Sequence, residues 1–276
     1  MYLLVFSEAQ AKTLTRYIGN VRSTLLKLDV VGVPDVPLSY KAGMARLRQM
    51  PVLQHFKEPA SPAMVIHLLA SKTIPLPIRA TVACMWAAGL RVGEVTNPDM
   101  REDSLPEEFV MRRGDVSMAL DGGSFSLLLR HSKGDAVNCG YVVHIMANRD
   151  GQGGLAPSSS CPVTMMQRLL ASAGRRDDPT APLFAFPNGD MVTRQHIADA
   201  IKATAVAVGV DPALFSTHSI RIGAATQLAA RQVSTLDILS WGRWRSEATA
   251  LRYLRLAPAR LRIIGAALTL RQEEVW

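Results

Sequence analysis

The last quarter of the sequence contains two basic side chains whose spacing suits the binding of an anion. His218 and Arg221 lie three residues apart on a predicted helix, so both side chains point to one face of it. Both also fall near its start, where the positive end of the helix dipole favours an anion. We interpret the pair as a candidate phosphate site, and the alternative is an ordinary capped turn at the protein surface.

A tyrosine further along the chain has the surroundings of a nucleophile. Tyr253 lies next to Arg252 and close to Arg255, nine residues after Trp244. Neighbouring positive charge favours the phenolate form, which can attack phosphorus. The alternative is a packed tyrosine whose hydroxyl faces water.

Two upstream segments add charged groups. Arg91 follows an apolar helix in the segment 87–94, and a guanidinium near a core needs a carboxylate or a phosphate partner. Glu94, three residues after Arg91, is spaced to orient its guanidinium.

Lys133 falls at the tip between two predicted strands, where an ammonium could protonate a leaving oxygen. A solvated turn lysine is the alternative reading of Lys133.

A mostly helical framework must position these residues. Alternating polarity predicts strands over 116–120, 124–130 and 141–145, the first two joined by a hairpin turn at 121–123. Apolar residues at helical spacing predict helices over 9–28, 40–50, 62–71, 78–90, 163–173, 193–208, 217–231, 235–241, 246–254 and 261–270. The predicted fold class is therefore α+β, mainly α with a small antiparallel sheet.

Closely spaced prolines between 51 and 62 resist both helix and sheet, and they predict a linker. The linker separates a short helical region, 1–58, from a larger domain, 59–276.

The composition favours a polyanionic partner. The 276 residues include 31 Lys and Arg against 23 Asp and Glu, which leaves a net charge of +8. Arginine, with 24 of the 31, binds phosphate through a planar fork, although a GC-rich coding sequence would produce the same bias. We find no secretory signal and no apolar run of about 18 residues, so we expect an intracellular protein without a membrane span. The three cysteines are far apart, which argues against a disulfide framework and against a metal cluster.

In this order the candidate residues resemble the catalytic set of the tyrosine recombinases, also called phage integrases. The resemblance covers roughly residues 60–270, and it is closest to the Cre-type branch, in which a tryptophan likewise precedes the tyrosine by nine residues. Ile222 departs from the histidine of many members, and region 1–58 is shorter than the usual amino-terminal clamp domain, so it is either truncated or reduced. The matching residues are Arg91, Lys133, His218, Arg221, Trp244 and Tyr253.

The resemblance implies a site-specific recombinase or integrase that forms a 3′-phosphotyrosyl link to DNA without metal, ATP or another cofactor. Tyr253 would be the nucleophile, Arg91 and Arg221 would bind the non-bridging oxygens, and Lys133 would protonate the leaving 5′-oxygen. His218 would accept the tyrosine proton, Trp244 would position the phosphate, and Glu94 would orient Arg91. Further arginines expected to contact DNA are Arg130, Arg243, Arg245, Arg252 and Arg255.

The implied partner is double-stranded DNA with an inverted-repeat target site. It would be bound by a tetramer in which segment 261–270 docks into a neighbouring protomer, or else packs within its own. The protein would then be associated with DNA, in the cytoplasm or nucleoid of a prokaryote or in the nucleus of a eukaryote, and a mobile genetic element is a natural source. Two other functions fit the same residues: relaxation of DNA in the manner of a type IB topoisomerase, and DNA binding by a catalytically inactive remnant of a mobile element.

Overall fold

The computed structural model of the chain describes residues 57–96, 110–130, 132, 139–149, 154, 159–172 and 178–244. These residues all belong to Phe56–Trp276, the second of two compact units into which the chain divides. The helices predicted over 9–28, 40–50, 246–254 and 261–270 fall outside the described residues, as do Lys133, Arg245, Arg252, Tyr253 and Arg255.

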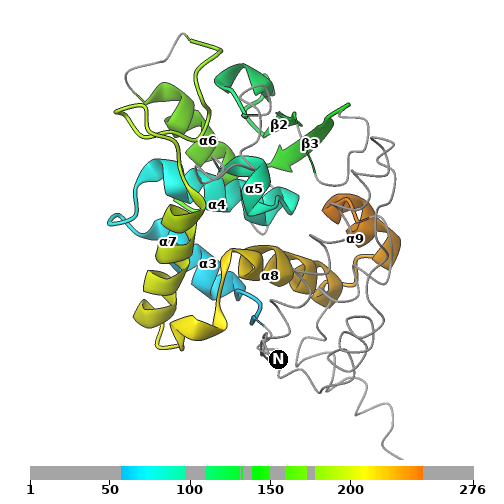
Figure 1. Cartoon of the computed structure of the whole chain (residues 1–276). Helices are drawn as coiled ribbons and strands as arrows, with labels where there is room; N and C mark the ends of the chain where they lie inside the picture. Colours follow the sequence, from blue (N-terminus) through cyan, green and yellow to red (C-terminus); the bar gives the residue numbers. More distant parts are fainter. Residues whose placement is uncertain are drawn as a thin grey trace, which may run out of the picture. The chain divides into compact units, whose positions relative to one another are not determined.

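The described residues form seven α-helices and one small antiparallel sheet (Figure 1). The sequence predicts the sheet and six of these helices, and the short helix at 92–95 was not predicted. Two short 3-10 helices, η2 (Arg113–Asp115) and η3 (Pro212–Leu214), were not predicted. The helices are α3 (Pro62–Ala70), α4 (Leu76–Ala88), α5 (Val92–Val95), α6 (Pro162–Ala171), α7 (Arg194–Ala207), α8 (Thr217–Ala230) and α9 (Thr235–Gly242). The strands are β1 (Val116–Met118), β2 (Ser124–Leu129) and β3 (Tyr141–Met146).

Helix α4 is the hub of this unit, because it contacts α3, α5, α6, α7, α8 and strand β3. Its only charged side chain is Arg79, and its buried residues are distributed around the helix. A helix that is apolar all round belongs in a core. It starts two residues before the predicted position, because Pro77 occupies the first turn, where no backbone N–H is required.

The sheet has the order β1-β2-β3, and both pairs of strands are antiparallel. The alternation of the sequence is visible in β2, where Phe125, Leu127 and Leu129 are buried and the residues between them are half-buried. The hairpin turn forms as predicted, with Gly122 in the left-handed region. Strand β1 ends at Met118, two residues before the predicted end.

The first described residues already belong to this packed unit. Glu58 donates its backbone N–H to the carbonyl of Leu214 at 2.7 Å, and Ala60 donates to Ser219 at 2.9 Å. Ala60 is 1% exposed. The later part of the stretch predicted as a linker is therefore held against η3 and α8, because its backbone groups find partners there.

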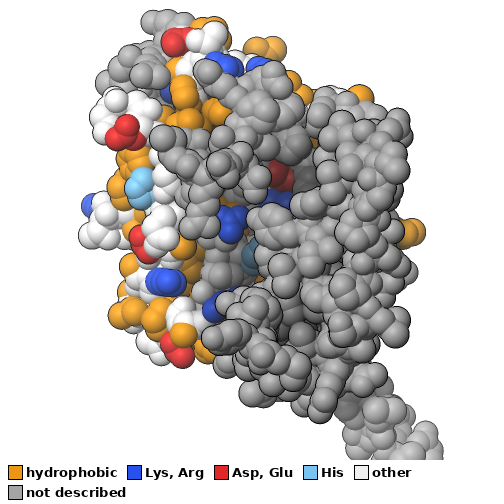
Figure 2. Space-filling view, in the orientation of Figure 1, with side chains coloured by type: hydrophobic (Ala, Val, Ile, Leu, Met, Phe, Trp, Pro, Cys, Tyr) orange, Lys and Arg blue, Asp and Glu red, His pale blue; other side chains and the backbone are white. Residues whose placement is uncertain are grey.

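The charged side chains of the described residues are dispersed on the face shown in Figure 2, where basic, acidic and apolar groups alternate. None of the described helices has the length and apolar character that a membrane span would require.

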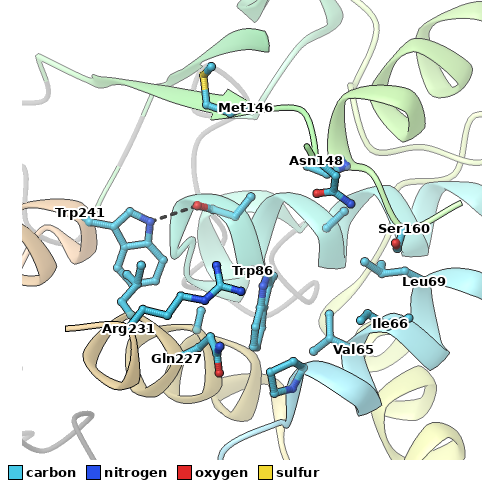
Figure 3. Close-up of a pocket in the computed structure, with 16 residues that line it drawn as sticks. Val65, Ile66, Leu69, Trp86, Met146, Asn148, Ser160, Gln227, Arg231 and Trp241 are labelled. Atoms are coloured by element: carbon cyan, nitrogen blue, oxygen red, sulfur yellow. Dashed lines mark hydrogen bonds between the residues drawn. The ribbon is translucent and has the colours of Figure 1, made fainter. Parts of the chain in front are cut away.

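A cavity of about 380 Å³ opens between α3, α4 and α8 (Figure 3). Trp241 lines it, and its indole Nε1 donates to the carbonyl of Ala87 at 3.0 Å. Arg91, His218 and Arg221 do not line this cavity, so the basic residues of interest meet elsewhere.

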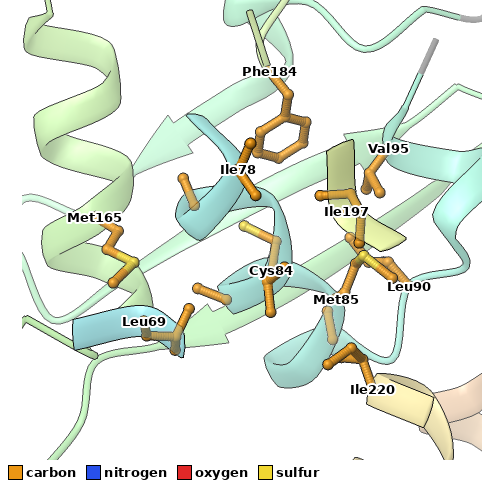
Figure 4. Close-up of a cluster of buried hydrophobic side chains, with 14 of the residues drawn as sticks. Leu69, Ile78, Cys84, Met85, Leu90, Val95, Met165, Phe184, Ile197 and Ile220 are labelled. Atoms are coloured by element: carbon orange, nitrogen blue, oxygen red, sulfur yellow. The ribbon is translucent and has the colours of Figure 1, made fainter. Parts of the chain in front are cut away.

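One hydrophobic core joins the helices to the sheet. Figure 4 shows Leu69, Met85, Met165 and Ile197 converging on it from α3, α4, α6 and α7. Cys84 also lies in this core, and burial raises the pKa of its thiol to about 12. Cys84, Cys139 and Cys161 are free thiols in the structure, and of these three only Cys139 is exposed.

Helix α4 ends at Gly89, whose φ of +57° is left-handed. A Cβ at this position would lie 2.7 Å from the ring of Trp241. Glycine is required here twice over, for its backbone conformation and for the close approach of the indole.

We predict that Gly89→Ala lowers the free energy of unfolding by about 3 kcal/mol, of which left-handed strain accounts for about 1–2 kcal/mol. The matched control is Gly209→Ala, because Gly209 has a φ of +76° and an added Cβ would meet no atom within 4 Å. Urea unfolding of both variants measures the difference. Equal losses would show that the Trp241 contact contributes nothing.

Candidate active site

Arg91 and Glu94 occupy a sharp turn between α4 and α5. After Gly89 the chain becomes extended at Arg91, which is the N-cap of α5. Glu94 reaches back from the third helical position, where its Oε2 accepts the backbone N–H of Arg91 at 2.8 Å. Its Oε1 forms an ion pair with Nη1 of Arg91 at 2.8 Å. Glu94 therefore binds both the backbone N–H and the guanidinium of Arg91, which is the N-cap of α5.

Ser132 completes this pair from a distant part of the chain. Its hydroxyl donates to Oε1 of Glu94 at 2.7 Å and accepts Nη1 of Arg91 at 3.2 Å. The side chain is fully buried. Ser132 directly precedes Lys133, so the segment that carries the predicted lysine is anchored at this point to the Arg91–Glu94 pair.

Glu94 also holds a second arginine. Nη2 of Arg243 lies 3.1 Å from Oε2 of Glu94, and both side chains are almost fully buried. Burial raises the pKa of Glu94, but the charge of Arg243, the bonds from Arg91 and Ser132, and the charge of Arg91 outweigh it. The pKa of Glu94 is consequently below its ordinary value, and the carboxylate is ionised at neutral pH.

Arg221 is buried in α8, with 2% of its surface exposed. Its Nη1 donates to the carbonyl of Gly89 and its Nη2 to the carbonyl of Gly242. These carbonyls lie at the C-terminal ends of α4 and α9, where the helix dipole is negative. The guanidinium is therefore fixed between two helix ends.

Trp244 covers the same guanidinium. The Cζ of Arg221 lies 4.4 Å from the centroid of the Trp244 ring, which is a cation–π contact. The ring folds back so closely on Gly242 that a Cβ there would collide with it. Trp244 therefore packs against Arg221, and its predicted contact with a phosphate stays a prediction.

His218 lies one turn before Arg221, and part of its side chain is exposed while its ring is partly shielded by the protein. It lies in the first turn of α8 as predicted, whereas Arg221 is the fifth helical residue and points inward. Desolvation of the His218 ring lowers its pKa, and the charges of Arg194, Arg221 and Arg91 lower it further. The imidazole is therefore neutral at pH 7 and able to accept a proton.

Two arginines expected to contact DNA have partners inside the protein. Arg130 binds both carboxylate oxygens of Asp115, at 2.8 and 2.7 Å, and this bond raises the pKa of Arg130. Arg243 is 7% exposed and bonds to Glu94 and to backbone carbonyls. The Arg130 bonds join η2 to the residue after β2, and the Arg243 bonds join the end of α9 to the end of α4 and to α5.

The sequence predicted Arg91, Glu94, His218, Arg221 and Trp244, and the structure brings them together from α5, α8 and the end of α9. Sequence reasoning missed Ser132 and the partners of Arg243. The only signal for Ser132 was its place beside Lys133, and Arg243 lies inside the Gly-Arg-Trp stretch. Among the described residues no cluster of His, Cys, Asp and Glu could hold a metal ion.

No protein-family model matches the sequence, and no curated protein matches it. Solved structures do match its fold. A crystal structure of XerA recombinase has a TM-score of 0.53 at 19% identity, over 92% of this chain and 74% of that one. A crystal structure of a lambda integrase dimer bound to a core site has a TM-score of 0.51 at 17% identity, and the match covers 92% of this chain and 65% of that one. A structure of the Tn1549 transposon integrase in complex with circular intermediate DNA has a TM-score of 0.54 at 12% identity, and the match covers 95% of this chain and 84% of that one.

These proteins are tyrosine recombinases, so the chain shares the catalytic-domain fold of that family, as the resemblance predicted. Its closer likeness to the Cre-type branch stays a prediction.

We predict that Glu94→Gln lowers the free energy of unfolding at about pH 7 by about 3 kcal/mol, because it leaves Arg243 buried without a charged partner. The pKa of Glu94 is lowered on folding, so its contribution is present above the ordinary value of 4.5 and is lost as the pH falls through the lowered value. Urea unfolding over this range should show the two proteins converging in acid. Glu58→Gln, at an exposed carboxylate, is the control, and a gap that stays constant in acid would contradict the assignment.

We predict that Arg194→Gln raises the pKa of His218 toward its ordinary value of 6.5, because one of the charges that lowers it is removed. Proton NMR titration of the imidazole, assigned with His218→Gln, measures this. Lys202→Gln removes the same charge from an exposed position on the same helix and should leave the titration unchanged. An equal shift in both variants would mean that the effect is one of net charge.

Proposed function

We propose that the chain is a site-specific DNA recombinase that cleaves and rejoins DNA through a tyrosine. The observation that supports it most is the meeting of Arg91, Arg221 and His218 in a fold that known tyrosine recombinases share. Two fixed guanidiniums and a neutral imidazole match the needs of phosphoryl transfer, which are charge stabilisation and proton acceptance.

Arg91 and Arg221 bind the non-bridging oxygens of the scissile phosphate in this mechanism. Arg91 is held in advance by Glu94 and Ser132. A donor that needs no reorganisation stabilises the charge of the pentavalent transition state by about 3 kcal/mol. Arg221 is held by two helix ends and is 2% exposed, so its contact with the phosphate requires the guanidinium to become accessible when DNA binds. Trp244 keeps the Arg221 plane in place through the cation–π contact.

The covalent step exchanges one phosphoester for another. The hydroxyl of Tyr253 loses its proton to neutral His218, and its oxygen forms a bond to phosphorus. The bond from phosphorus to the 5′-oxygen breaks, and that oxygen takes a proton from Lys133. Lys133 follows Ser132 in the chain, and the contacts of Ser132 with Arg91 and Glu94 support this role. The 3′-phosphotyrosyl link conserves the bond energy, so the reverse attack by a 5′-hydroxyl needs no ATP.

The partner in this proposal is double-stranded DNA with an inverted-repeat site, bound by four protomers. The solved structures that share the fold include complexes with DNA, which supports a DNA partner. Binding should weaken steeply as salt rises, because phosphate contacts release counterions. The protein would accordingly be found with the DNA of its host.

We predict that the protein forms a covalent adduct with DNA through Tyr253. Fragments of the DNA that flanks its coding sequence, each nicked to prevent religation, are incubated with the protein and denatured in detergent. Protein-linked fragments are recovered and sequenced, and the modified peptide is identified by mass spectrometry. Tyr253→Phe should bind the recovered site within about twofold of wild type and form no adduct, since only the nucleophile is lost.

Tyr2→Phe makes the same chemical change elsewhere and should retain the adduct. An adduct that survives Tyr253→Phe would contradict the nucleophile assignment. Binding without any adduct in the wild type would identify an inactive DNA-binding remnant. An adduct formed by a strictly 1:1 complex that relaxes supercoils would identify a type IB topoisomerase activity.

A further inference from the structure

Arg243 has a backbone conformation that its residue type rarely adopts. Its φ and ψ are 52° and 43°, in the left-handed region at the C-terminal end of α9. Apart from glycines, the only described residues with a positive φ are Arg243 and Gln232. Side chains with a β-carbon are disfavoured in this region, so the presence of arginine here calls for a function of its side chain.

The side chain of Arg243 is buried and binds the end of another helix. Its Nη1 donates to the carbonyl of Ala88 at 3.1 Å and to that of Trp241 at 3.2 Å. Its Nη2 donates to the carbonyl of Gly89 at 3.1 Å and to Oε2 of Glu94 at 3.1 Å. A planar fork with several donors can make these bonds together, whereas a lysine ammonium cannot span them.

The two carboxylate oxygens of Glu94 accept hydrogen bonds from two arginines, Arg91 and Arg243. Oε1 binds Nη1 of Arg91 and the hydroxyl of Ser132. Oε2 binds the backbone N–H of Arg91 and Nη2 of Arg243. The bond from Arg243 therefore fixes the rotation of the carboxylate, and the rotation decides where Oε1 holds the Arg91 guanidinium.

We propose that Arg243 is a positioning residue for strand cleavage, which acts on Arg91 through the shared carboxylate of Glu94. The inference rests on the proposed function. Arg243 is 7% exposed and donates to Glu94 and to three backbone carbonyls, and through Glu94 it is linked to Arg91. Misplacing a catalytic group by about 1 Å can cost on the order of 100-fold in rate.

The test compares Arg243→Gly with Gln232→Gly. Glycine accepts both left-handed positions, so backbone strain is relieved in both variants, and only the first loses a guanidinium. We expect Arg243→Gly to form the phosphotyrosyl adduct at least about 10-fold more slowly at saturating DNA. Its affinity for DNA should stay within about twofold of wild type, and Gln232→Gly should match wild type in both respects.

A readout without DNA follows the position of Arg91 directly. The charge of Arg91 acts on the His218 ring, and Arg243 is not among the charges that do so. A displaced Arg91 should therefore change the NMR titration of His218 in Arg243→Gly and leave it unchanged in Gln232→Gly. Ethylguanidinium in the vacated space should restore both the titration and the cleavage rate.

Cleavage by Arg243→Gly within about twofold of Gln232→Gly would overturn the proposal. If Arg243→Gly shows no cooperative unfolding transition, the same cleavage measurement is made with Arg243→Lys. Lysine reaches either the carboxylate or the carbonyls, so slower cleavage is still expected, and a wild-type rate would overturn the proposal. A wild type that forms no adduct with any DNA would refute the proposed function. In that case an unchanged His218 titration would separately refute the positioning of Arg91.

Discussion

The buried guanidinium of Arg221 joins the end of α4 to the end of α9, and the candidate site is arranged around this contact. Burying an unpaired cation is costly, and here two helix-terminal carbonyls and the face of Trp244 compensate it. The two helix ends can meet only because Gly89 and Gly242 have no side chains to keep the indoles away. One cation therefore determines how two distant parts of the chain meet.

The electrostatics of the site follow from that meeting. Three arginines lie near one another, and among the described residues Glu94 is the carboxylate that binds two of them. Desolvation lowers the pKa of His218, and the positive charges of Arg194, Arg221 and Arg91 lower it further. Elsewhere on the face in Figure 2, basic and acidic side chains of the described residues are interspersed.

Many of the helices and strands could be predicted because local sequence signals, such as capping residues and alternating polarity, mark where these elements begin and end. Ser61 and Pro62 begin α3, Gly89 ends α4, and the period-two pattern identifies β2 and β3. The short helix α5 was missed, since four residues are too few to show a period. The chain near Ala60 was predicted as a linker because its prolines indicate that no helix forms there. Prolines give no information about packing, and this segment packs against α8.

The sequence alone determined the chemical inventory and its order: Arg91 with Glu94, then Lys133, His218 with Arg221, Trp244 and Tyr253. It did so because residue types and short spacings are local properties. The tertiary structure decided which cations are held and by what, so that Arg221 lies between two helix ends, Ser132 joins the Arg91–Glu94 pair, and Arg243 turns inward to Glu94. These contacts join residues up to about 150 positions apart. Arg221 and part of Arg243 bind backbone carbonyls, which every residue carries and no sequence pattern distinguishes, whereas Ser132 and Arg243 reach Glu94 only because the fold brings the side chains together.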